Sequence, residues 1–258
     1  MARSEGGRTV ANELAVVVGA SGDFGRRIVA RLIDSGLDVL AVARSEAPLQ
    51  ALRAECPRVI PCVADIASDE SVAAIGAALD RPVRMVVHGP GVAVAGGVLD
   101  APVAALVDAV NIKVGGLLRL VRAVDPHLRA GSRLVAIGGH YGFEPTAYAA
   151  SAGIANAALV NAVRQLSLAY GARGITAHLV APGPADTERL HRVAADRARQ
   201  RGIDSAAVLA EMCAESSLGA FTTPEQVAWA VALLLAPEAD AMTGSTLMLD
   251  SGRRRGLP

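Results

Sequence analysis

The chain has 258 residues, and its 25 lysines and arginines balance its 25 aspartates and glutamates, so the formal net charge is zero. A balanced charge argues against a nucleic acid partner. Hydrophobic residues make up 52% of the chain, but every apolar segment is short and interrupted, so we expect a large core and no membrane span.

The N-terminus and the cysteines predict a cytoplasmic protein. The first residues, MARSEGGRTVANE, lack the apolar region of a secretory signal. Cys56, Cys62 and Cys213 show no metal-ligand spacing, and an odd number of cysteines is typical of a reducing compartment. We therefore expect no metal site and no disulfide framework.

Strands and helices are predicted to alternate along the whole chain. Strands are expected at 14–18, 37–43, 58–63, 83–87, 132–137, 175–180 and 246–249. Helices are expected after residue 25 and at 47–55, 68–79, 103–128, 147–170, 187–215 and 224–235. This alternation of apolar strands with helices predicts one α/β domain over residues 1–258, a three-layer, doubly wound structure around a parallel sheet.

A glycine-rich turn follows the first predicted strand. Gly19, Gly22 and Gly25 come after the apolar run Leu14–Val18, and helical spacing resumes at Ile28. Glycines at such a turn let the backbone approach a phosphate, which the N–H groups of the following helix can bind. The alternative is a tight turn that binds nothing, because a glycine pattern alone is a weak signal.

The end of the second predicted strand indicates which dinucleotide would fit. An acidic residue there would bind the ribose 2′-hydroxyl of NAD(H), whereas an arginine accommodates the 2′-phosphate of NADP(H). The chain has Ala43 and Arg44 at this place and no acid. NADP(H) is therefore favoured, and the alternative is that Arg44 is an ordinary surface residue.

Several motifs in this order resemble the short-chain dehydrogenase/reductase family. They are Gly19-Ala20-Ser21-Gly22-Asp23-Phe24-Gly25, Asp65-Ile66, Asn111, Tyr148-Ala149-Ala150-Ser151, Pro182-Gly183-Pro184-Ala185-Asp186-Thr187 and the ending from Thr243-Gly244 to Asp250-Ser251-Gly252. The resemblance implies a Rossmann fold with a seven-stranded parallel sheet, and a small-molecule substrate. It also implies a cofactor site formed by Gly19, Ser21, Gly22, Phe24, Gly25, Arg44, Asp65, Ile66, Gly89, Pro182 and Gly183, with Asp65 and Ile66 beside the adenine.

The glycine motif departs from the usual family spacing. The glycines stand at the first, fourth and seventh places instead of the first, fifth and seventh, and Asp23 lies in the turn. A carboxylate near a pyrophosphate would repel it, and Arg26 or Arg27 could offset the repulsion. We expect a cofactor that is weakly bound or structural.

The catalytic residues of the family are only partly present. Tyr148 and Asn111 match the family's tyrosine and asparagine, but Ala152 stands where the family has its lysine, four residues after the tyrosine. Gly138-Gly139 stands in place of the family's serine. The chain is thus identified as a divergent member that lacks the lysine that lowers the pKa of the tyrosine.

Two other residue types could replace the missing lysine and serine. Lys113 is the only lysine, but it lies two residues from Asn111, roughly 200° around a helix, so we expect it to face away from the site. His88 and His140 follow strand ends, where an imidazole could act as an acid or base. We select Tyr148, Asn111 and His140 as catalytic candidates; the histidines could instead be packing residues.

Three functions remain open. The first is an NADP(H)-dependent oxidoreductase of specialised metabolism with an atypical site, acting on the carbonyl or alcohol of a small substrate. The second is a non-redox enzyme of the same fold, a cyclase, dehydratase, isomerase or lyase, that uses Tyr148 and His140. The third is a non-catalytic partner of an active relative. The family resemblance also implies a helical substrate lid at roughly 187–217 and a homodimer or homotetramer formed through the helices at 103–128 and 147–170.

Overall fold

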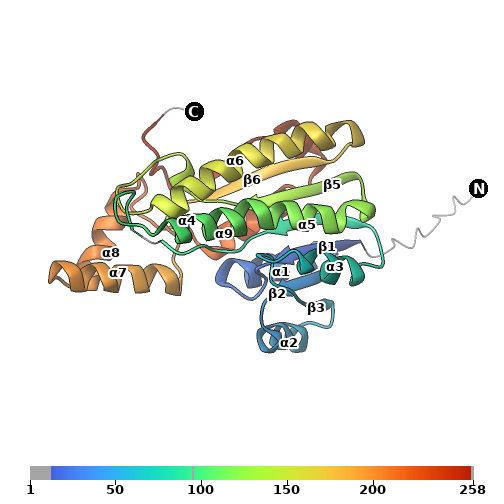
Figure 1. The fold of residues 1–258 in the computed structure, drawn as a ribbon, viewed down its shortest axis with the longest axis horizontal. Coiled ribbons are helices and arrows are strands. Elements are labelled where there is room, and N and C mark those ends of the chain that lie inside the picture. The colour runs from blue at the N-terminus through green and yellow to red at the C-terminus, as the bar shows by residue number, and fades with distance from the viewer. Residues whose placement is uncertain (1–12, 95, 257–258) are drawn as a thin grey trace, which may run out of the picture.

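The predicted elements form one parallel sheet that is covered by helices on both faces (Figure 1). The structure is a computed structural model, and it describes residues 13–94 and 96–256. The expectation about a missing secretory signal concerns residues 1–12, which lie outside the described residues.

The sheet has the strand order β3-β2-β1-β4-β5-β6-β7, and every neighbouring pair is parallel. The strands are β1 (Leu14–Val18), β2 (Asp38–Ala43), β3 (Val59–Val63), β4 (Val83–His88), β5 (Leu128–Ile137), β6 (Thr176–Pro182) and β7 (Thr246–Leu249). The prediction of a doubly wound, seven-stranded parallel sheet is confirmed.

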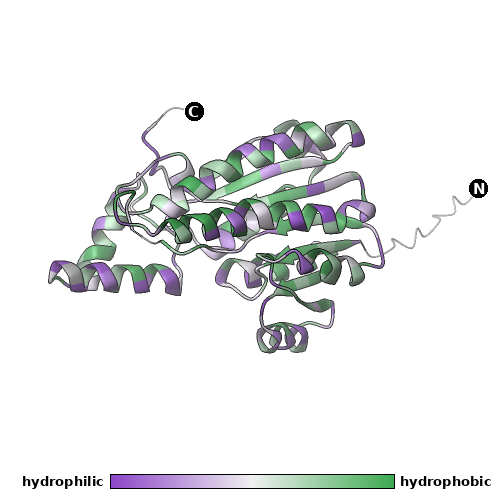
Figure 2. Cartoon of the chain, in the orientation of Figure 1, coloured by the Kyte–Doolittle hydropathy of each residue, from purple (hydrophilic) through white to green (hydrophobic). Residues whose placement is uncertain are grey.

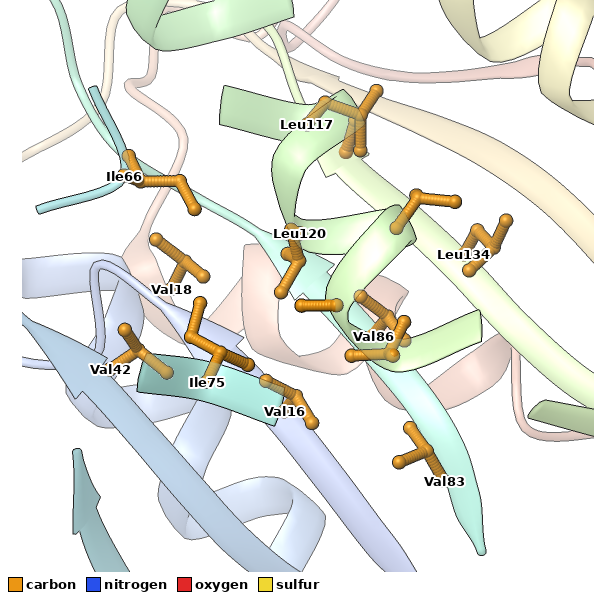
Figure 3. Close-up of a cluster of buried hydrophobic side chains, with 14 of the residues drawn as sticks. Val16, Val18, Val42, Ile66, Ile75, Val83, Val86, Leu117, Leu120 and Leu134 are labelled. Atoms are coloured by element: carbon orange, nitrogen blue, oxygen red, sulfur yellow. The ribbon is translucent and has the colours of Figure 1, made fainter. Parts of the chain in front are cut away.

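Helices pack on both faces because successive strand side chains point to opposite sides. The helices are α1 (Asp23–Asp34), α2 (Glu46–Glu55), α3 (Glu70–Ala77), α4 (Val103–Val110), α5 (Gly116–Val124), α6 (Ala150–Tyr170), α7 (Glu188–Arg201), α8 (Ser205–Ala214) and α9 (Pro224–Leu233). Helices α3, α5 and α6 share one core cluster with the strands, and α1, α2 and α9 share the other. Figure 3 shows part of the first cluster, in which Val16 and Val18 of β1 face Ile75 of α3 and Leu120 of α5.

Three predicted helices differ from the structure, and all three contribute residues to the candidate site or lie beside it. The helix expected at 103–128 is interrupted by a π-helical segment, Asn111–Gly115, and β5 already begins at Leu128. The helix expected from residue 147 begins at Ala150, so that Tyr148 lies in the turn before it. The charged stretch 187–215 forms two helices, α7 and α8, separated at Gly202, which has a φ of +65°.

The chain changes direction in the sheet between β1 and β4. Strands β1, β2 and β3 extend one way from this point, and β4 to β7 extend the other way. Loops after the carboxyl ends of β1 and β4 therefore diverge, which leaves a crevice where such sheets bind ligands. Helices α7 and α8 lie beyond one end of the layers (orange in Figure 1). Within the described residues, no helix combines the length and apolarity needed to cross a membrane.

Candidate active site

The glycine turn after β1 packs too closely for side chains at two of its positions. Gly19 has a φ of +83°, and a Cβ atom there would lie 3.2 Å from the backbone of Gly89 after β4. A Cβ atom on Gly25 would lie 2.1 Å from the carbonyl oxygen of Gly19. Gly22 has ordinary room, 3.6 Å from the same oxygen. The turn thus brings the N-terminus of α1 against the loop after β4 at the crevice.

The charged residues around this turn are arranged differently from the expectation. Asp23 is exposed at the start of α1. Arg26 pairs with Glu55 at 3.9 Å, and Arg27 pairs with Glu225 at 2.9 Å. The expected compensation of Asp23 by these two arginines is therefore not seen.

The other expected cofactor residues lie at the same edge of the sheet but differ in exposure. Arg44 is exposed at the end of β2 and forms no ion pair with the described residues. Asp65 is exposed, and its carboxylate accepts a hydrogen bond from the Ala67 N–H at 3.0 Å. The side chain of Ile66 is buried in the core (Figure 3), which leaves only its backbone for a ligand. Ser21 is half-buried and its carbonyl oxygen accepts from Arg26.

One cleft of about 360 Å³ runs from the glycine turn to the loop after β5 and to α7. Its cofactor end is lined by Gly19, Gly22, Asp23, Phe24, Gly25, Gly89, Pro182 and Gly183. Its other end is lined by Val92, Lys113, Gly139, His140, Tyr141, Tyr148, Ala152, Asn156, Arg189, Leu190, Val193, Arg197 and Met212. The cleft thus joins the expected dinucleotide turn to Tyr148 and His140. The described residues contain no group of three or more potential metal ligands that could hold an ion.

Lys113 lies in this cleft, and the prediction that it faces away is wrong. Its side chain is 4% exposed, and Nζ donates a hydrogen bond of 2.8 Å to the carbonyl oxygen of Ile137 at the end of β5. Burial, reinforced by the positive charge of Arg189, lowers the pKa of Lys113 to about 7. The chain therefore does place an amine in the cleft, although on a different element from the one that the family resemblance implies.

Asn111 is turned to the opposite side. Its Nδ2 donates to the carbonyl oxygen of Ala67 at 2.9 Å, and its Oδ1 accepts from Arg119 at 2.9 Å. It does not line the cleft. The two residues do face different ways, as expected; the π-helical segment directs Lys113 inward and uses Asn111 to tie the helix to the loop after β3.

Tyr148 is paired with a second tyrosine and an arginine. Its hydroxyl oxygen lies 2.9 Å from that of Tyr141, and the two rings meet edge to face. The Arg197 guanidinium carbon lies 3.9 Å from the Tyr148 ring centre. Burial acts to raise the pKa of Tyr148, but the Tyr141 hydroxyl and the charge of Arg197 outweigh it and lower the pKa. Burial and the bond to Tyr148 raise the pKa of Tyr141. The geometry suits Tyr141 as a donor that stabilises a Tyr148 phenolate.

Helix α6 presents Ala152 and Asn156 to the cleft. They are one turn apart, and both are buried. Asn156 Nδ2 would lie 3.1 Å from a Cβ atom on Gly139, and Asn156 Oδ1 has no hydrogen-bond partner within the described part of the chain. Because Tyr148 lies outside the helix, the spacing from Tyr148 to Ala152 is not one helical turn. Asn156 supplies the polar group of α6 in this part of the cleft.

The three buried histidines have different surroundings. His140 lines the cleft, packs against Tyr141 with ring centres 4.0 Å apart and ring planes tilted by 42°, and leaves Nε2 without a partner among the described residues. Burial, with the charge of Arg253, lowers its pKa to about 4. His88 is fully buried and bonded to the Ile112 carbonyl oxygen, and its pKa is lowered to about 3 by burial and by Lys113. His178 is also fully buried. His140 alone among these three reaches the cleft.

Sequence reasoning missed four residues whose charged or amide side chains line the cleft. They are Lys113, Asn156, Arg189 and Arg197. The lone lysine in an arginine-rich chain was a usable signal for Lys113. No local sequence pattern predicts a π-helical segment. The arginines of α7 that face the cleft cannot be distinguished from those that face solvent unless the orientation of α7 is known.

A protein-family model matches most of the chain. The model described as enoyl-(acyl carrier protein) reductase matches residues 19–254. The short-chain reductase protein NovJ of Streptomyces niveus is 28% identical, over 93% of this chain and 93% of that protein.

Solved structures match the fold closely. L-Sorbose reductase from Gluconobacter frateurii, crystallised with NADPH and L-sorbose, has a TM-score of 0.88 at 21% identity and covers 96% of this chain and 98% of its own. A variant of actinorhodin polyketide ketoreductase, crystallised with NADPH, has a TM-score of 0.85 at 24% identity and covers 94% and 97%. At these identities the two structures support the fold alone.

Proposed function

Because the chain belongs to the short-chain dehydrogenase/reductase family, we propose that it is an NADP(H)-dependent oxidoreductase with an atypical site, acting on a carbonyl or alcohol of a small substrate. The observation that carries this proposal is the single cleft that joins the glycine turn at Gly19 to Tyr148 and Lys113. The relative NovJ, a short-chain reductase that is 28% identical over 93% of this chain, supports the reductase class. NADP(H) and a setting in specialised metabolism are proposed by analogy with NADPH-bound structures of the same fold, one of them a polyketide ketoreductase.

The residues present fit a dinucleotide. Because Gly19 and Gly25 have no Cβ atoms, the turn packs closely against the loop after β4. This places the turn at the N-terminus of α1, where backbone N–H groups can bind a phosphate. The residues proposed to hold the cofactor are Gly19, Ser21, Gly22, Phe24, Gly25, Gly89, Pro182, Gly183 and, through its carboxylate, Asp65. Arg44 is proposed to bind the 2′-phosphate, because an exposed guanidinium at this place has no acidic partner among the described residues.

The bound cofactor, when reduced, supplies a hydride to a carbonyl carbon. The hydroxyl of Tyr148 is proposed to give the proton to the carbonyl oxygen, and the Tyr141 hydroxyl and Arg197 stabilise the phenolate that results. Lys113 is proposed to supply positive charge at the end of β5. His140 stays neutral above pH about 4, and its imidazole, at the wall of the cleft, is proposed to contact the substrate. Asn111 receives no acid–base role, because its amide is engaged outside the cleft.

Non-redox chemistry is the second candidate. The observation in its favour is the proton-transfer set itself: Tyr148, His140 and Lys113 surround the cleft without the family's serine and helical lysine. These groups could move protons in an isomerase, dehydratase, cyclase or lyase, with any bound dinucleotide structural. A non-catalytic partner of an active relative is the third.

The deciding experiment combines a cofactor titration with a turnover assay. NADPH fluorescence should report binding to the wild type, with weaker binding of NADH. Arg44→Ser should lower NADPH affinity about tenfold or more and leave NADH unchanged, because a charge-assisted contact to phosphate is lost. Arg31→Ser on α1, an exposed arginine without an ion pair among the described residues, is the matched control.

The outcomes separate the reductase from the other two functions. NADPH oxidation with a carbonyl panel supports the reductase. Cofactor binding without any oxidation favours non-redox chemistry. The absence of binding by both cofactors rules out the first proposal.

The remaining expectations are kept as proposals. Helices α7 and α8 are proposed to form the substrate lid, residues 187–217, since both contribute side chains to the cleft. Exposed Val103 and Val107 on α4, with Ile154 on α6, support association of copies through these helices as a homodimer or homotetramer. Light scattering of the purified protein would test this. The free thiols of Cys56, Cys62 and Cys213 support a reducing, cytoplasmic setting.

A further inference from the structure

The arginines of helix α7 fall into two groups. Those on its outer side pair with acids: Arg192 with Glu188, Arg199 with Asp196, and Arg201 with Glu211. Arg189 and Arg197 line the cleft instead, and neither pairs with a carboxylate among the described residues. Figure 2 shows the alternation of hydrophilic and hydrophobic bands along this helix. The arginines on the outer side of α7 are thus paired with carboxylates, whereas the two that line the cleft are not.

The cleft-lining residues of α7 follow helical spacing. Arg189, Val193 and Arg197 are four residues apart, so they lie along one side of the helix, with the two arginines about 12 Å apart at the backbone. Arg189 Nη2 donates to the Val92 carbonyl oxygen in the loop after β4. Arg197 lies over the Tyr148 ring. Both arginines thus lie at the end of the cleft that contains the tyrosine pair, and Arg189 keeps part of its surface exposed to solvent.

No carboxylate among the described residues pairs with Arg189 or Arg197. Lys113 adds a third basic group, and Asp23, at the glycine turn, is the only acid among the described residues that lines the cleft, while Asp250 and Glu144 act on His140 from outside this lining. The charge of Arg189 is felt by Lys113, whose pKa it helps to lower. Cations that face one another in a partly enclosed space are costly unless an anion neutralises them. This arrangement calls for an anion.

The remaining lining residues indicate the polarity of the rest of the ligand. Leu190, Val193, Met212 and Val92 line the cleft beside the two tyrosine rings. They suit an apolar or aromatic body. A guanidinium prefers a planar carboxylate, which it can bind through two parallel hydrogen bonds.

We propose that the substrate of this site is an apolar or aromatic carbonyl compound that carries a carboxylate, which Arg189 and Arg197 bind. That the substrate contains a carbonyl group rests on the function proposed above. The binding of its carboxylate does not depend on hydride transfer. It gives α7 a role in substrate selection.

The test compares two probes of the same shape and different charge. Benzoate and benzamide are titrated into the full-length protein by calorimetry, with and without saturating NADP⁺. We expect benzoate to bind at least about tenfold more tightly than benzamide. The preference should disappear in Arg189→Gln and Arg197→Gln, which keep a polar side chain of similar length without the charge. It should persist in Arg192→Gln and Arg199→Gln on the outer side of the same helix.

The outcomes are distinct from those for cofactor use. Equal binding of the two probes, no binding of benzoate at millimolar concentration, or a preference that survives in both cleft variants would overturn the proposal. A loss of NADPH affinity in Arg189→Gln and Arg197→Gln, measured by fluorescence, would assign these arginines to the cofactor phosphates and also overturn it. A benzoate preference in a protein that never oxidises NADPH would uphold carboxylate binding while rejecting the reductase.

Discussion

Lys113 donates a hydrogen bond of 2.8 Å from Nζ to the carbonyl oxygen of Ile137, where β5 ends at the cleft. The bond joins the π-helical segment Asn111–Gly115 to the sheet. No carboxylate among the described residues compensates this amine, so its charged form is disfavoured by burial and by Arg189, and its pKa falls to about 7. Near neutral pH about half of the folded molecules carry a charge here.

The stability of the fold should therefore rise with pH above neutrality. Between pH 7 and 9 the folded Lys113 loses its proton, whereas the unfolded lysine, with a pKa near 10.4, keeps it. The unfolded state then binds more protons, so the free energy of unfolding increases with pH, by about 2 kcal/mol over this interval. Urea unfolding at pH 7 and pH 9 measures it.

Lys113→Met is the control variant for this increase in unfolding free energy with pH. The variant keeps an apolar stem of similar length and should lack the Lys113 contribution. The pKa of the buried Cys62 thiol, which burial raises, affects both proteins equally. Equal pH dependence in wild type and variant would show that Lys113 keeps an ordinary pKa.

The glycine turn gives a prediction with its own internal control. Gly25→Ala places a Cβ atom 2.1 Å from the Gly19 carbonyl oxygen, so backbone must move, and we expect a loss of about 1–3 kcal/mol in unfolding free energy. Gly22→Ala meets the same oxygen only at 3.6 Å and should fold normally. Denaturant unfolding of both variants measures the contrast. Equal stability of the two would mean that the turn is looser than described.

The sequence predicted the sheet well because its signals are local. Apolar runs bounded by Gly, Pro or charge mark each strand, and the residues at the strand ends, from Gly19 to Pro182, follow from the topology. The opening glycine turn was located correctly for the same reason. The partners of the charged residues beside this turn are not predictable in this way. Arg26 and Arg27 form ion pairs with Glu55 and Glu225, which are distant in sequence.

The catalytic end was harder because it depends on two departures from ideal helices. A regular helix places Asn111 and Lys113 on different sides but cannot say which side faces the cleft. Helix α6 begins at Ala150, so Tyr148 is not part of it. The prediction that Ala152 lies one helical turn from Tyr148 depended on both residues being in the same helix. Asn156 then becomes the polar neighbour of Gly139, which spacing counted from Tyr148 could not show.

Adding a lysine at Ala152 should consequently damage the protein rather than repair it. Ala152 is 5% exposed and packs with Val92, Ala109 and Ala155. A lysine there overpacks this cluster and adds a cation to the cleft that already holds Lys113, so we expect a loss of about 1–3 kcal/mol in unfolding free energy. Thermal and urea unfolding measure this, with Ala157→Lys, on the exposed side of the same helix, as the control. A stable Ala152→Lys protein that reduces carbonyls faster than wild type would contradict the expectation.

Tyr141 should control the pH dependence of the proposed reduction. Its hydroxyl, 2.9 Å from that of Tyr148, lowers the pKa of Tyr148, so Tyr141→Phe should raise that pKa toward its ordinary value near 10. Tyr148 must be protonated to give its proton, and reduction therefore slows as pH rises through its pKa. In Tyr141→Phe the fall in kcat/KM should move to higher pH, whereas Tyr148→Phe should lose about 10²–10⁴-fold at pH values below the pKa of Tyr148. Tyr170→Phe, which removes a hydroxyl bonded to Asp125, is the control and should follow the wild-type profile. A Tyr141→Phe profile that coincides with the wild type would show that the hydroxyl pair does not set the proton affinity of Tyr148.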